Sequence, residues 1–595
     1  MNTITTARDI AKMIDHSLLN PVMTKEDIIE GCKIAKKYEV ATVCVKPSEL
    51  SLAVNELSGS GVLPTTVIGF PHGANKTSVK VYEALEAIAD GAKEIDMVLN
   101  IGRLLSGDYN YVENDIKAVV GTAHAENVIV KVIFENCYLT DEQKRIACDI
   151  CEKAGADFVK TSTGYGTGGA TIEDITLMRQ ACSQRVRVKA AGGVRTLEKA
   201  IEVRAAGADR FGATATKAIM DEALALDKRR NSMPWRLVQN KIVRYPGGRE
   251  IDKFRGVEPA LDDGKPEAWI GSDTRTFMAA RGGDPDDGCA ECVLPDGTQM
   301  YLYKAIAADP QAALGLKHIE INGPRMGFLV KLLDAQRQLS LQTHPTRAYA
   351  KEFYNSDFGK EESWYVIGMR EDTDEPPYVY MGFKEGVSRE MFEAGYEAQD
   401  IATLESYCHK LTVSIGDAFF IKAGVPHAVG PGCFLIEVQE PSDITAGWRK
   451  RSRGSPEEQE AYKQRLLGCY VYDGASEEEN LRRYRIPPRT IRSGSWGYEE
   501  LIIGQGQTDY FSFTKLHAES EIDFIKTGFP QIAIVTEGNG VMTCGDTAMR
   551  IKRGDEFFIP YAADDIKLKP SAAPADAEPG VTVVLCNPGQ VYYNI

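Results

Sequence analysis

Two different architectures are predicted for this chain: an α/β barrel of eight parallel strands, of the TIM type, followed by an all-β half. Up to about residue 228, short apolar runs alternate with amphipathic segments at a spacing of roughly 25 to 35 residues, which is typical of βα units. Eight such units in about 220 residues favour a closed (β/α)8 barrel over an open sheet. After about residue 245, turn sequences such as PGG, DDGK and PDG separate short strands, which indicates an all-β fold with hairpins.

The barrel strands follow from the apolar runs. Several runs are apolar on both faces, as expected of parallel strands that helices cover. Amphipathic stretches such as 24–38 and 196–207 are expected to be the helices between them. The eight expected strands are 14–19, 41–45, 65–70, 94–99, 128–134, 157–163, 186–191 and 209–214.

The carboxyl-terminal half is expected to contain two barrel-like β units. A strand-rich stretch precedes a charged helical segment near 449–487, and another follows it. The segment 570–580, rich in alanine and proline, is expected to be a loop. The resulting boundaries are a barrel domain at 1–228, a polar linker at 229–242, a first β unit at 243–448, a helical insertion at 449–487 and a second β unit at 488–595.

Composition limits the function classes. The 595 residues include 85 Asp and Glu against 69 Lys and Arg, a formal charge of −16. This balance argues against nucleic acid or an anionic membrane surface as the main partner. No apolar run is long enough to span a bilayer, and no signal peptide is recognised. The 13 cysteines at irregular spacings indicate reduced thiols, so a cytoplasmic location is expected.

Three charged residues mark the barrel as a candidate active site. Asp96, Lys160 and Lys189 lie on expected strands, and catalytic groups of this fold sit at the carboxyl ends of strands. Burial and mutual repulsion should lower the pKa of at least one lysine, which favours an amine nucleophile that forms a Schiff base. Lys131, on the fifth expected strand, could add to the positive electrostatic field around these two lysines. Taken alone, a lysine on a strand is more often only part of a salt bridge. Lys160 and Lys189, however, each precede glycines whose backbone N–H groups can bind a phosphate.

A second candidate site lies in the first β unit. Gln342 and His344 share one face of a strand, and Lys360, Glu361 and Glu362 begin the next one. His427 and Glu437 follow a turn further along the chain. Two histidines and a carboxylate on facing strands can hold a divalent metal. A single histidine in a turn is more often a capping residue, but the ordered set favours a metal site.

The first half resembles 2-deoxyribose-5-phosphate aldolase over about residues 8–225, through IDHSLL, VCVKP, GFPHG, EIDMVLNIG, KVIFENCYLT, DFVKTSTGYGTGGAT, VKAAGGVRT and RFGAT. The resemblance implies metal-free, reversible cleavage of deoxyribose 5-phosphate to acetaldehyde and glyceraldehyde 3-phosphate. It makes Lys160 the Schiff-base lysine, Lys189 the residue that lowers its pKa, and Asp96 the group that handles protons. Cys44 would lie close without being required. The implied substrate and phosphate residues are Thr163, Gly164, Gly192, Gly193, Gly212 and Thr214. One departure is Thr214-Ala215, where the family often has two serines.

The second half resembles a type I mannose-6-phosphate isomerase, a cupin enzyme, through PEAWIGSDTR, LSLQTHP, GKEESWYVIG, MGFKEGV and AGVPHAVGPGCFLIEVQEPSD. The similarity covers about residues 243–445 well and 450–595 loosely. It implies an aldose–ketose isomerase with a double cupin fold and a metal site in the first cupin only, since the second has just His517. The implied ligands of Zn²⁺ are Gln342, His344, Glu362 and His427, with Ser340 and Lys360 beside the substrate.

Gly447 is a departure from this second family, which usually has a catalytic arginine four residues after the aspartate of SD. Either Arg449 substitutes for it, or the domain acts on another sugar phosphate, or it binds sugar without turnover. Two CxxC pairs, at 148–151 and 289–292, are better explained by core packing and by a free or loosely paired thiol than by a metal.

The fusion leaves three interpretations open. The two sites could be enzymes for separate sugar phosphates, the aldolase could cleave a product of the cupin, or the cupin could sense a sugar phosphate and regulate the aldolase. Deoxyribose 5-phosphate has no hydroxyl at C2, which an aldose–ketose isomerase requires, so independent sites are favoured. Small sugar phosphates are the expected partners, and a homo-oligomer is compatible with the aldolase resemblance.

Overall fold

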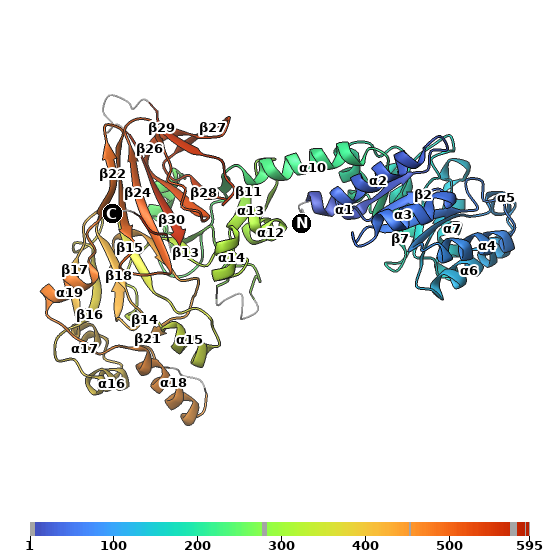
Figure 1. The fold of residues 1–595 in the computed structure, drawn as a ribbon. Helices are drawn as coiled ribbons and strands as arrows, with labels where there is room; N and C mark the ends of the chain where they lie inside the picture. Colours follow the sequence, from blue (N-terminus) through green and yellow to red (C-terminus); the bar gives the residue numbers. More distant parts are fainter. Residues whose placement is uncertain (1–5, 277–282, 451–453, 572–579, 590, 594–595) are drawn as a thin grey trace. The chain divides into compact units, whose positions relative to one another are not determined.

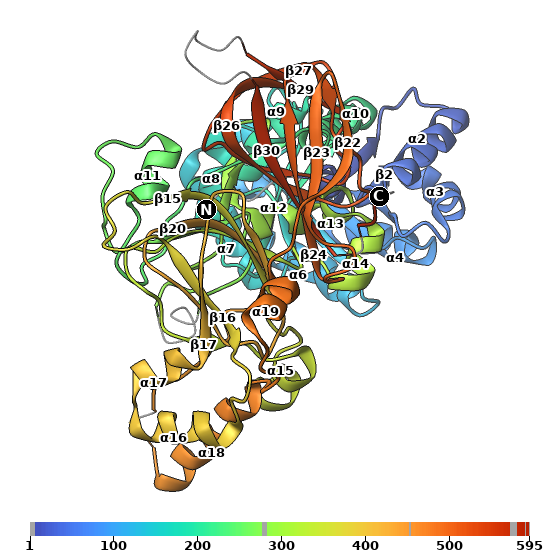
Figure 2. The same cartoon turned by 90° about the vertical axis from the view of Figure 1, so that its left-hand side faces the viewer.

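The computed structural model describes residues 6–276, 283–450, 454–571, 580–589 and 591–593. It divides into two compact units, one of residues 5–228 and the other containing residues 229–595. The first is α/β and the second is built mainly of antiparallel strands, as Figures 1 and 2 show. The predicted fold class is therefore confirmed.

The first unit is a closed barrel in which eight parallel strands pair in chain order, and β8 closes it against β1. All eight expected strands are present, each within a few residues of its predicted range. They are β1 (Ile14–Leu18), β2 (Thr42–Val45), β3 (Leu63–Ile68), β4 (Glu94–Val98), β5 (Ile129–Ile133), β6 (Phe158–Lys160), β7 (Arg187–Ala190) and β8 (Arg210–Ala213).

Helices cover the barrel on the outside (Figure 1). Thr6, Thr24 and Thr140 begin three of them with capping boxes, in which the threonine side chain accepts from the third helical N–H and the third side chain accepts from the threonine N–H. The helices are α1 (Ala7–Met13), α2 (Lys25–Lys37), α3 (Leu50–Leu57), α4 (Thr77–Ala89), α5 (Ile101–Leu105), α6 (Tyr109–His124), α7 (Asp141–Ala154), α8 (Ile172–Ala181), α9 (Leu197–Ala205) and α10 (Thr216–Asn231), with short 3₁₀ turns at Pro47–Glu49 and Asn136–Tyr138.

Two five-stranded sheets of the second unit form a jelly roll, which we call the first jelly roll, and enclose an apolar core. One sheet has the order β10 (Glu267–Ile270), β13 (Leu329–Asp334), β20 (Cys433–Gln439), β15 (Glu362–Met369) and β18 (Ala418–Ile421). The other has the order β17 (Cys408–Thr412), β16 (Tyr378–Phe383), β19 (His427–Val429), β14 (Gln342–Thr343) and β21 (Ala446–Gly447).

The remaining strands form a twelve-stranded sheet. Its main path is β12 (Gln299–Tyr301), β11 (Glu291–Val293), β9 (Trp235–Leu237), β28 (Glu556–Ile559), β26 (Gln531–Cys544), β30 (Val581–Pro588), β24 (Phe511–Ala518), β23 (Gly497–Ile503) and β22 (Arg489–Gly494). The strands off this path are β25 (Ile522–Asp523), β27 (Thr547–Lys552) and β29 (Ile566–Pro570). One apolar cluster joins this sheet to the first jelly roll.

The expected linker 229–242 differs from the structure. It contains β9, whose residues Trp235 and Arg236 pair with Phe558 and Phe557 of β28. Trp235 is fully buried, so burial of this side chain draws the segment into the carboxyl-terminal sheet. Most of the loop expected at 570–580 lies outside the described residues.

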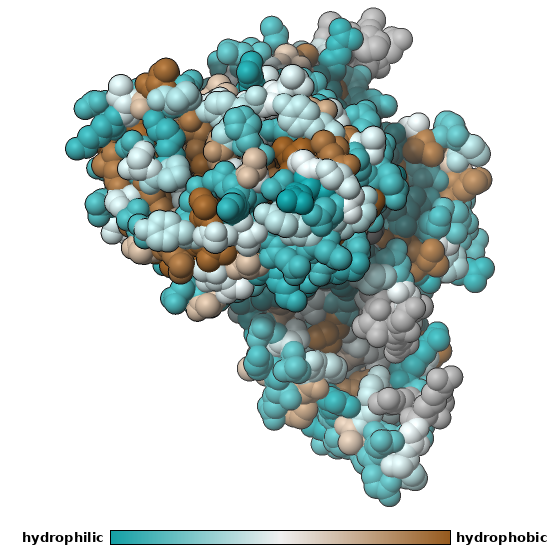
Figure 3. Space-filling view, turned by 90° about the vertical axis from the view of Figure 1, so that its right-hand side faces the viewer, coloured by the Kyte–Doolittle hydropathy of each residue, from teal (hydrophilic) through white to brown (hydrophobic). Residues whose placement is uncertain are grey.

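Helices lie between the strands of the second unit and include α18 and α19 in the predicted insertion at 449–487. They are α11 (Arg249–Arg255), α12 (Leu302–Ala308), α13 (Pro310–Leu314), α14 (Leu316–Asn322), α15 (Arg347–Tyr354), α16 (Arg389–Ala398), α17 (Ile401–Ser406), α18 (Pro456–Cys469) and α19 (Glu477–Tyr484). Hydrophilic and hydrophobic residues are interspersed on the face that Figure 3 shows. Among the described residues, none of the helices combines the length and apolar character needed to cross a bilayer.

Candidate functional site

Three buried lysines surround one carboxylate inside the barrel. Asp96 lies on β4, and its Oδ2 accepts from the Nζ of Lys160 and the Nζ of Lys189, each at 2.7 Å. Its Oδ1 accepts from Lys131 Nζ at 2.8 Å. The parallel register explains this, because Lys160 pairs directly with Lys189, and Asp96 with Lys131. The barrel therefore brings together the four residues that the sequence singled out.

The lysines differ in their electrostatics. Burial, together with the charge of Lys189, lowers the pKa of Lys160, although Asp96 opposes this. Burial alone would also lower the pKa of Lys189, but the carboxylates of Asp15 and Asp96 outweigh it and raise that pKa. Lys160 is thus the amine that loses its proton more readily, and Lys189 is the cation beside it.

Lys131 belongs to a deeper layer of charges. Its Nζ lies 2.5 Å from Glu94 Oε2 and 3.5 Å from Asp15 Oδ2, and it is fully buried. Against the cost of burial, these carboxylates and Asp96 hold its pKa well above the usual range. Lys131 is therefore a fixed cation that supports Asp96, and it does not line the cavity.

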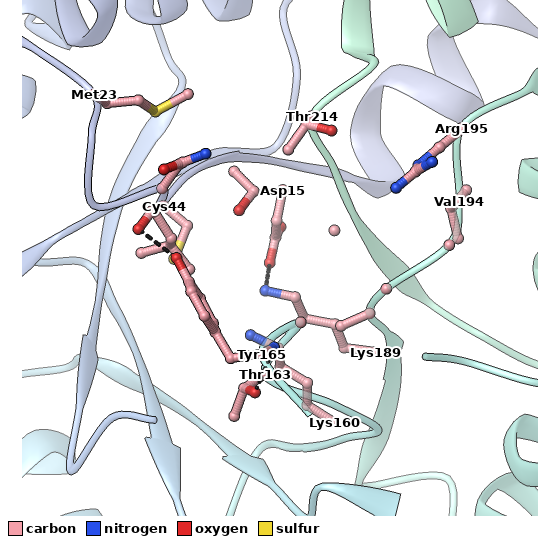
Figure 4. Close-up of a pocket in the computed structure, with 18 of the residues that line it drawn as sticks. Asp15, Met23, Cys44, Lys160, Thr163, Tyr165, Lys189, Val194, Arg195 and Thr214 are labelled. Carbon is pink, nitrogen blue, oxygen red and sulfur yellow. Dashed lines mark hydrogen bonds and ion pairs between the residues drawn. The ribbon is translucent and has the colours of Figure 1, made fainter. Parts of the chain in front are cut away.

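A cavity of about 560 Å³ opens onto Lys160 and Lys189. Figure 4 shows the amino groups of Lys160 and Lys189 side by side at the cavity, with Arg195 and Thr214 across from them. All the substrate-binding residues expected in the barrel line it: Thr163, Gly164, Gly192, Gly193, Gly212 and Thr214. Cys44 also lines it, and burial raises the pKa of its thiol to about 11.

Five further polar residues of this cavity were not predicted from the sequence. They are Asp15, Ser17, Asn20, Tyr165 and Arg195. Asp15 Oδ2 forms an ion pair with Lys189 Nζ at 2.5 Å, and the Tyr165 hydroxyl donates to the Leu19 carbonyl at 2.7 Å. Asp15 lies in the expected strand 14–19, so alternation along that strand could have identified it, whereas Arg195 lies beyond the end of the expected strand 186–191.

Two glycines at the cavity rim adopt conformations that favour glycine. Gly192 and Gly193 have φ values of 84° and 94°. A Cβ on Gly192 would lie 2.9 Å from the Cα of Gly169, whereas a Cβ on Gly193 would meet open space. These positions leave backbone groups accessible at the carboxyl ends of the strands, where this fold commonly binds phosphate.

The first jelly roll contains a buried cluster of two histidines and a carboxylate. His344 Nε2 lies 3.2 Å from Glu362 Oε2, and His427 Nε2 lies 3.1 Å from Glu362 Oε1. Gln342 Nε2 lies 3.5 Å from His427 Nε2, and these two residues pair across β14 and β19. The three titratable groups can together hold a metal ion, and burial and the nearby Lys360 lower the pKa of His344 to about 3.

The surroundings of this cluster orient its ligand atoms. His344 Nδ1 lies 2.8 Å from the carbonyl oxygen of Ile444, and His427 Nδ1 lies 2.9 Å from that of Val425. A proton on each Nδ1 leaves each Nε2 lone pair directed at the cluster, as in metal sites. Both Glu362 carboxylate oxygens are buried and face these two Nε2 atoms, and Oε2 also lies 2.9 Å from Lys360 Nζ. The donor set therefore fits a divalent cation such as zinc.

The expected substrate residues of the second site share one cavity of about 840 Å³. Ser340, Lys360 and Arg449 line it, together with the expected metal ligand Gln342. Lys360 Nζ lies 3.1 Å from His344 Nε2 and 2.9 Å from a Glu362 oxygen, so it joins the cavity to the cluster.

Glu437, one of the carboxylates that the sequence offers for the metal, lies elsewhere. Its Oε1 is 3.0 Å from Lys331 Nζ, and the Trp364 indole donates to its Oε2 at 3.2 Å. Register explains the difference, because Trp364 pairs with Glu437 while Glu362 pairs with Gln439. Glu362, and not Glu437, contacts the two histidines.

The remaining candidate ligands have structural partners. His517 Nδ1 lies 2.9 Å from Thr582 Oγ1 and belongs to no metal cluster in the described part of the chain. The cysteines of both CxxC pairs are free and buried, as expected of residues that pack in the interior.

Residues 10–221 match the DeoC/LacD family aldolase model. Over 215 residues, the chain is 52% identical to a deoxyribose-phosphate aldolase of Rhodopirellula baltica, covering 36% of this chain and 89% of that protein. The chain belongs to the deoxyribose-phosphate aldolase family. The aldolase of Thermococcus gammatolerans is 53% identical over 217 residues, which cover 36% of this chain and 96% of that protein. A solved aldolase from Aeropyrum pernix, described as tetrameric, is 30% identical over 38% of this chain and 94% of its own, with a TM-score of 0.36.

The other half matches a second family model. Residues 505–574 match the cupin domain of mannose-6-phosphate isomerase, which lies in the part where the sequence resemblance is looser. The solved mannose 6-phosphate isomerase of Bacillus subtilis is 19% identical over 60% of this chain and 99% of its own, with a TM-score of 0.45. The chain is thus an enzyme that joins an aldolase domain to a mannose-6-phosphate isomerase-like cupin domain.

Proposed function

We propose that the aldolase domain cleaves 2-deoxy-D-ribose 5-phosphate reversibly to acetaldehyde and glyceraldehyde 3-phosphate through a Schiff base on Lys160. The observation that carries this is the lowered pKa of Lys160 beside the cation Lys189, at a cavity rimmed by glycines. A neutral amine attacks the C1 carbonyl, and loss of water gives the imine. No metal is needed for this chemistry.

The imine then accepts the electrons of the breaking bond. Removal of the proton from the C3 hydroxyl forms the C3 carbonyl, and the C2–C3 electron pair moves into an enamine on Lys160. Protonation at C2 and hydrolysis release acetaldehyde. Asp96 is assigned to proton handling through water and to holding the lysines, and its pKa, despite burial, lies well below the ordinary range because of Lys131, Lys160 and Lys189.

Backbone groups and side chains at the rim bind the substrate phosphate in this proposal. Gly192, Gly193, Gly212 and Thr214 are the candidates, and Arg195 adds a positive charge at the same cavity. The hydroxyl of Thr214 takes the place of the first family serine.

Borohydride trapping tests the Schiff base. Reduction with borohydride in the presence of deoxyribose 5-phosphate should attach a stable adduct to the peptide that contains Lys160. Lys160→Ala should abolish both the adduct and aldol cleavage. Trapping that persists in this variant would refute the assignment.

We further propose that the cupin domain isomerises mannose 6-phosphate and fructose 6-phosphate with Zn²⁺ held by Gln342, His344, Glu362 and His427. The two directed Nε2 atoms and the two Glu362 oxygens that face them support this ligand set. When bound, such a metal would polarise the oxygens at C1 and C2 of the sugar, which would favour transfer of a proton between these carbons. Ser340 and Lys360 are assigned to the substrate phosphate or hydroxyls.

Gly447 occupies the position at which the isomerase family usually has a catalytic arginine. Arg449 is our candidate for the residue that takes over its role. Gly447 pairs with Gln342, and a Cβ on it would meet open space. Strand β21 ends at Gly447, and Arg449, two residues further along the chain, lines the cavity together with Gln342. Arg449→Ala should therefore lower isomerase kcat/KM, whereas Gly447→Arg in that background should restore part of it.

The alternative function is a cupin domain that acts on another sugar phosphate or binds one without turnover, and the glycine at 447 favours it. Incubation with mannose 6-phosphate separates these cases. Fructose 6-phosphate formation that a chelator abolishes supports the isomerase. Sugar-phosphate binding without conversion supports the sensor.

Sugar phosphates are the partners of both proposed reactions. A cytoplasmic location stays a prediction, supported by 13 free cysteines of which only Cys137 is exposed. Assembly into a homo-oligomer also stays a prediction, and sedimentation of the full chain tests it.

A further inference from the structure

Glu135 has a rare backbone conformation directly after barrel strand β5. Its φ and ψ are 57° and 64°, in the left-handed region that residues other than glycine seldom adopt. Its side chain is buried, with 2% of the residue exposed. Such conformations cost on the order of 1 kcal/mol and cluster at functional sites, so contacts of the side chain must hold Glu135 in place.

Both carboxylate oxygens of Glu135 bind the same residue, Thr163. The backbone N–H of Thr163 donates to Oε1 at 3.2 Å, and the Thr163 hydroxyl donates to Oε2. Thr163 is three residues beyond Lys160 and lines the aldolase cavity. Glu135 thus fixes both the backbone and the side chain of a cavity residue close to the reactive amine.

The hydroxyl group of Thr163 already uses most of its hydrogen-bonding positions. A hydroxyl has one proton to donate and two lone pairs that accept. Its proton is committed to Glu135, and one lone pair accepts from the N–H of Tyr165 at 3.0 Å. One acceptor lone pair is left, so Thr163 can accept a hydrogen bond from a ligand in the cavity but cannot donate one.

The loop over this contact is tightly packed. A Cβ on Gly166 would lie 2.9 Å from Glu135 Cδ and 3.0 Å from Cys137 Sγ. The loop therefore passes close to the carboxylate, and the side chain of Glu135 has little room to turn away from Thr163.

We propose that Glu135 is a positioning residue that fixes the Thr163 hydroxyl as a hydrogen-bond acceptor for a hydroxyl of the sugar phosphate. This inference rests on the proposed aldolase function and deepens it. The site then favours ligands that present a donor hydroxyl to Thr163. Acetaldehyde has no hydroxyl, so its reaction with Lys160 does not depend on this contact.

Glu135→Gln tests the proposal because it keeps the size of the side chain and replaces one acceptor by an NH2 donor. That NH2 group would donate to Thr163 Oγ1 and turn the hydroxyl proton toward the cavity. We expect kcat/KM for deoxyribose 5-phosphate cleavage to fall by about 10- to 100-fold, chiefly through KM, as for the loss of one buried hydrogen bond. Borohydride trapping of acetaldehyde on Lys160 should be unchanged.

A double-mutant cycle separates this role from a merely structural one. Thr163→Val should cost a similar factor, and adding Glu135→Gln to it should cost little more. Glu142→Gln, an exposed change on barrel helix α7, is the matched control and should match the unmodified chain. If Glu135→Gln slows acetaldehyde trapping equally, or multiplies the effect of Thr163→Val, the proposal is overturned.

If Glu135→Gln does not fold, Thr163→Ser and Thr163→Val decide: the serine variant should keep the KM for deoxyribose 5-phosphate, the valine variant should raise it, and an unchanged KM with valine overturns the proposal. The absence of trapping in the unmodified enzyme would instead refute the Schiff-base function.

Discussion

Replacement of Lys189 by methionine should suppress Schiff-base formation at neutral pH and leave it intact in alkali. Methionine fills a similar volume without a charge. Lys189 and Lys160 both contact Asp96 Oδ2 at 2.7 Å, so their nitrogens lie within twice that distance of each other. Removal of Lys189 takes away a positive charge that disfavours the ammonium form of Lys160, and it leaves Asp96 to stabilise that form.

The magnitude follows from Coulomb's law. At this separation and an effective dielectric constant of about 20, the repulsion between the two ammonium groups is at least about 3 kcal/mol. That energy corresponds to roughly a hundred-fold in the fraction of neutral amine below its pKa. The sign is fixed, because the charge of Lys189 lowers the pKa of Lys160 and its loss must raise it.

The assay is the initial rate of borohydride trapping of acetaldehyde as a function of pH. In Lys189→Met the rate at pH 7 should fall by about a hundred-fold, and it should recover as the pH is raised, because the neutral amine then forms again. A loss of rate that is the same at every pH would refute the electrostatic explanation. Lys189 would then act in another way, for example by donating a proton.

Three other predictions concern the barrel. Lys80 and Asp115 form a fully buried ion pair at 2.6 Å, so Lys80→Met should destabilise the aldolase domain by about 3 to 5 kcal/mol in denaturant unfolding, and Asp115→Leu added to it should recover part of this. Gly192→Ala, whose Cβ would lie 2.9 Å from the facing loop, should raise the KM for deoxyribose 5-phosphate in steady-state kinetics. Iodoacetamide at pH 7 should label the exposed Cys137 and spare Cys44, whose buried thiol has a pKa near 11, as peptide mass spectrometry can measure.

Parts of the structure that depend on local pattern were predictable from the sequence. The eight barrel strands follow from apolar runs at regular spacing, and Asp96, Lys160 and Lys189 were found because polar residues at strand ends of this fold converge on one mouth. Gln342 and His344 were predicted to act together because residues two apart lie on the same face of a strand.

Features that depend on pairing between distant segments were not predictable. Glu362 and Glu437 are both buried carboxylates on neighbouring strands, and only the register of β15 against β20 decides which one contacts the histidines. The short strand β9 carries no local signal that it pairs with β28, more than 300 residues later. Glu135 was missed because its left-handed conformation and its contact with Thr163 leave no mark in the spacing of residues.

The placement of the two sites leads to a final prediction about their coupling. The side chains around the aldolase cavity come from residues 15–214, and those around the cupin cavity come from residues 244–449, so each cavity is complete within one unit. Deoxyribose 5-phosphate has no oxygen at C2 and is no substrate for an aldose–ketose isomerase. We therefore expect independent activities: a chelator or Glu362→Gln should abolish isomerisation and leave aldol cleavage unchanged, and Lys160→Ala should do the reverse. Aldol cleavage that falls when the metal is removed would contradict this, since no aldolase cavity residue belongs to the metal cluster in the described chain, and it would favour a cupin that regulates the barrel.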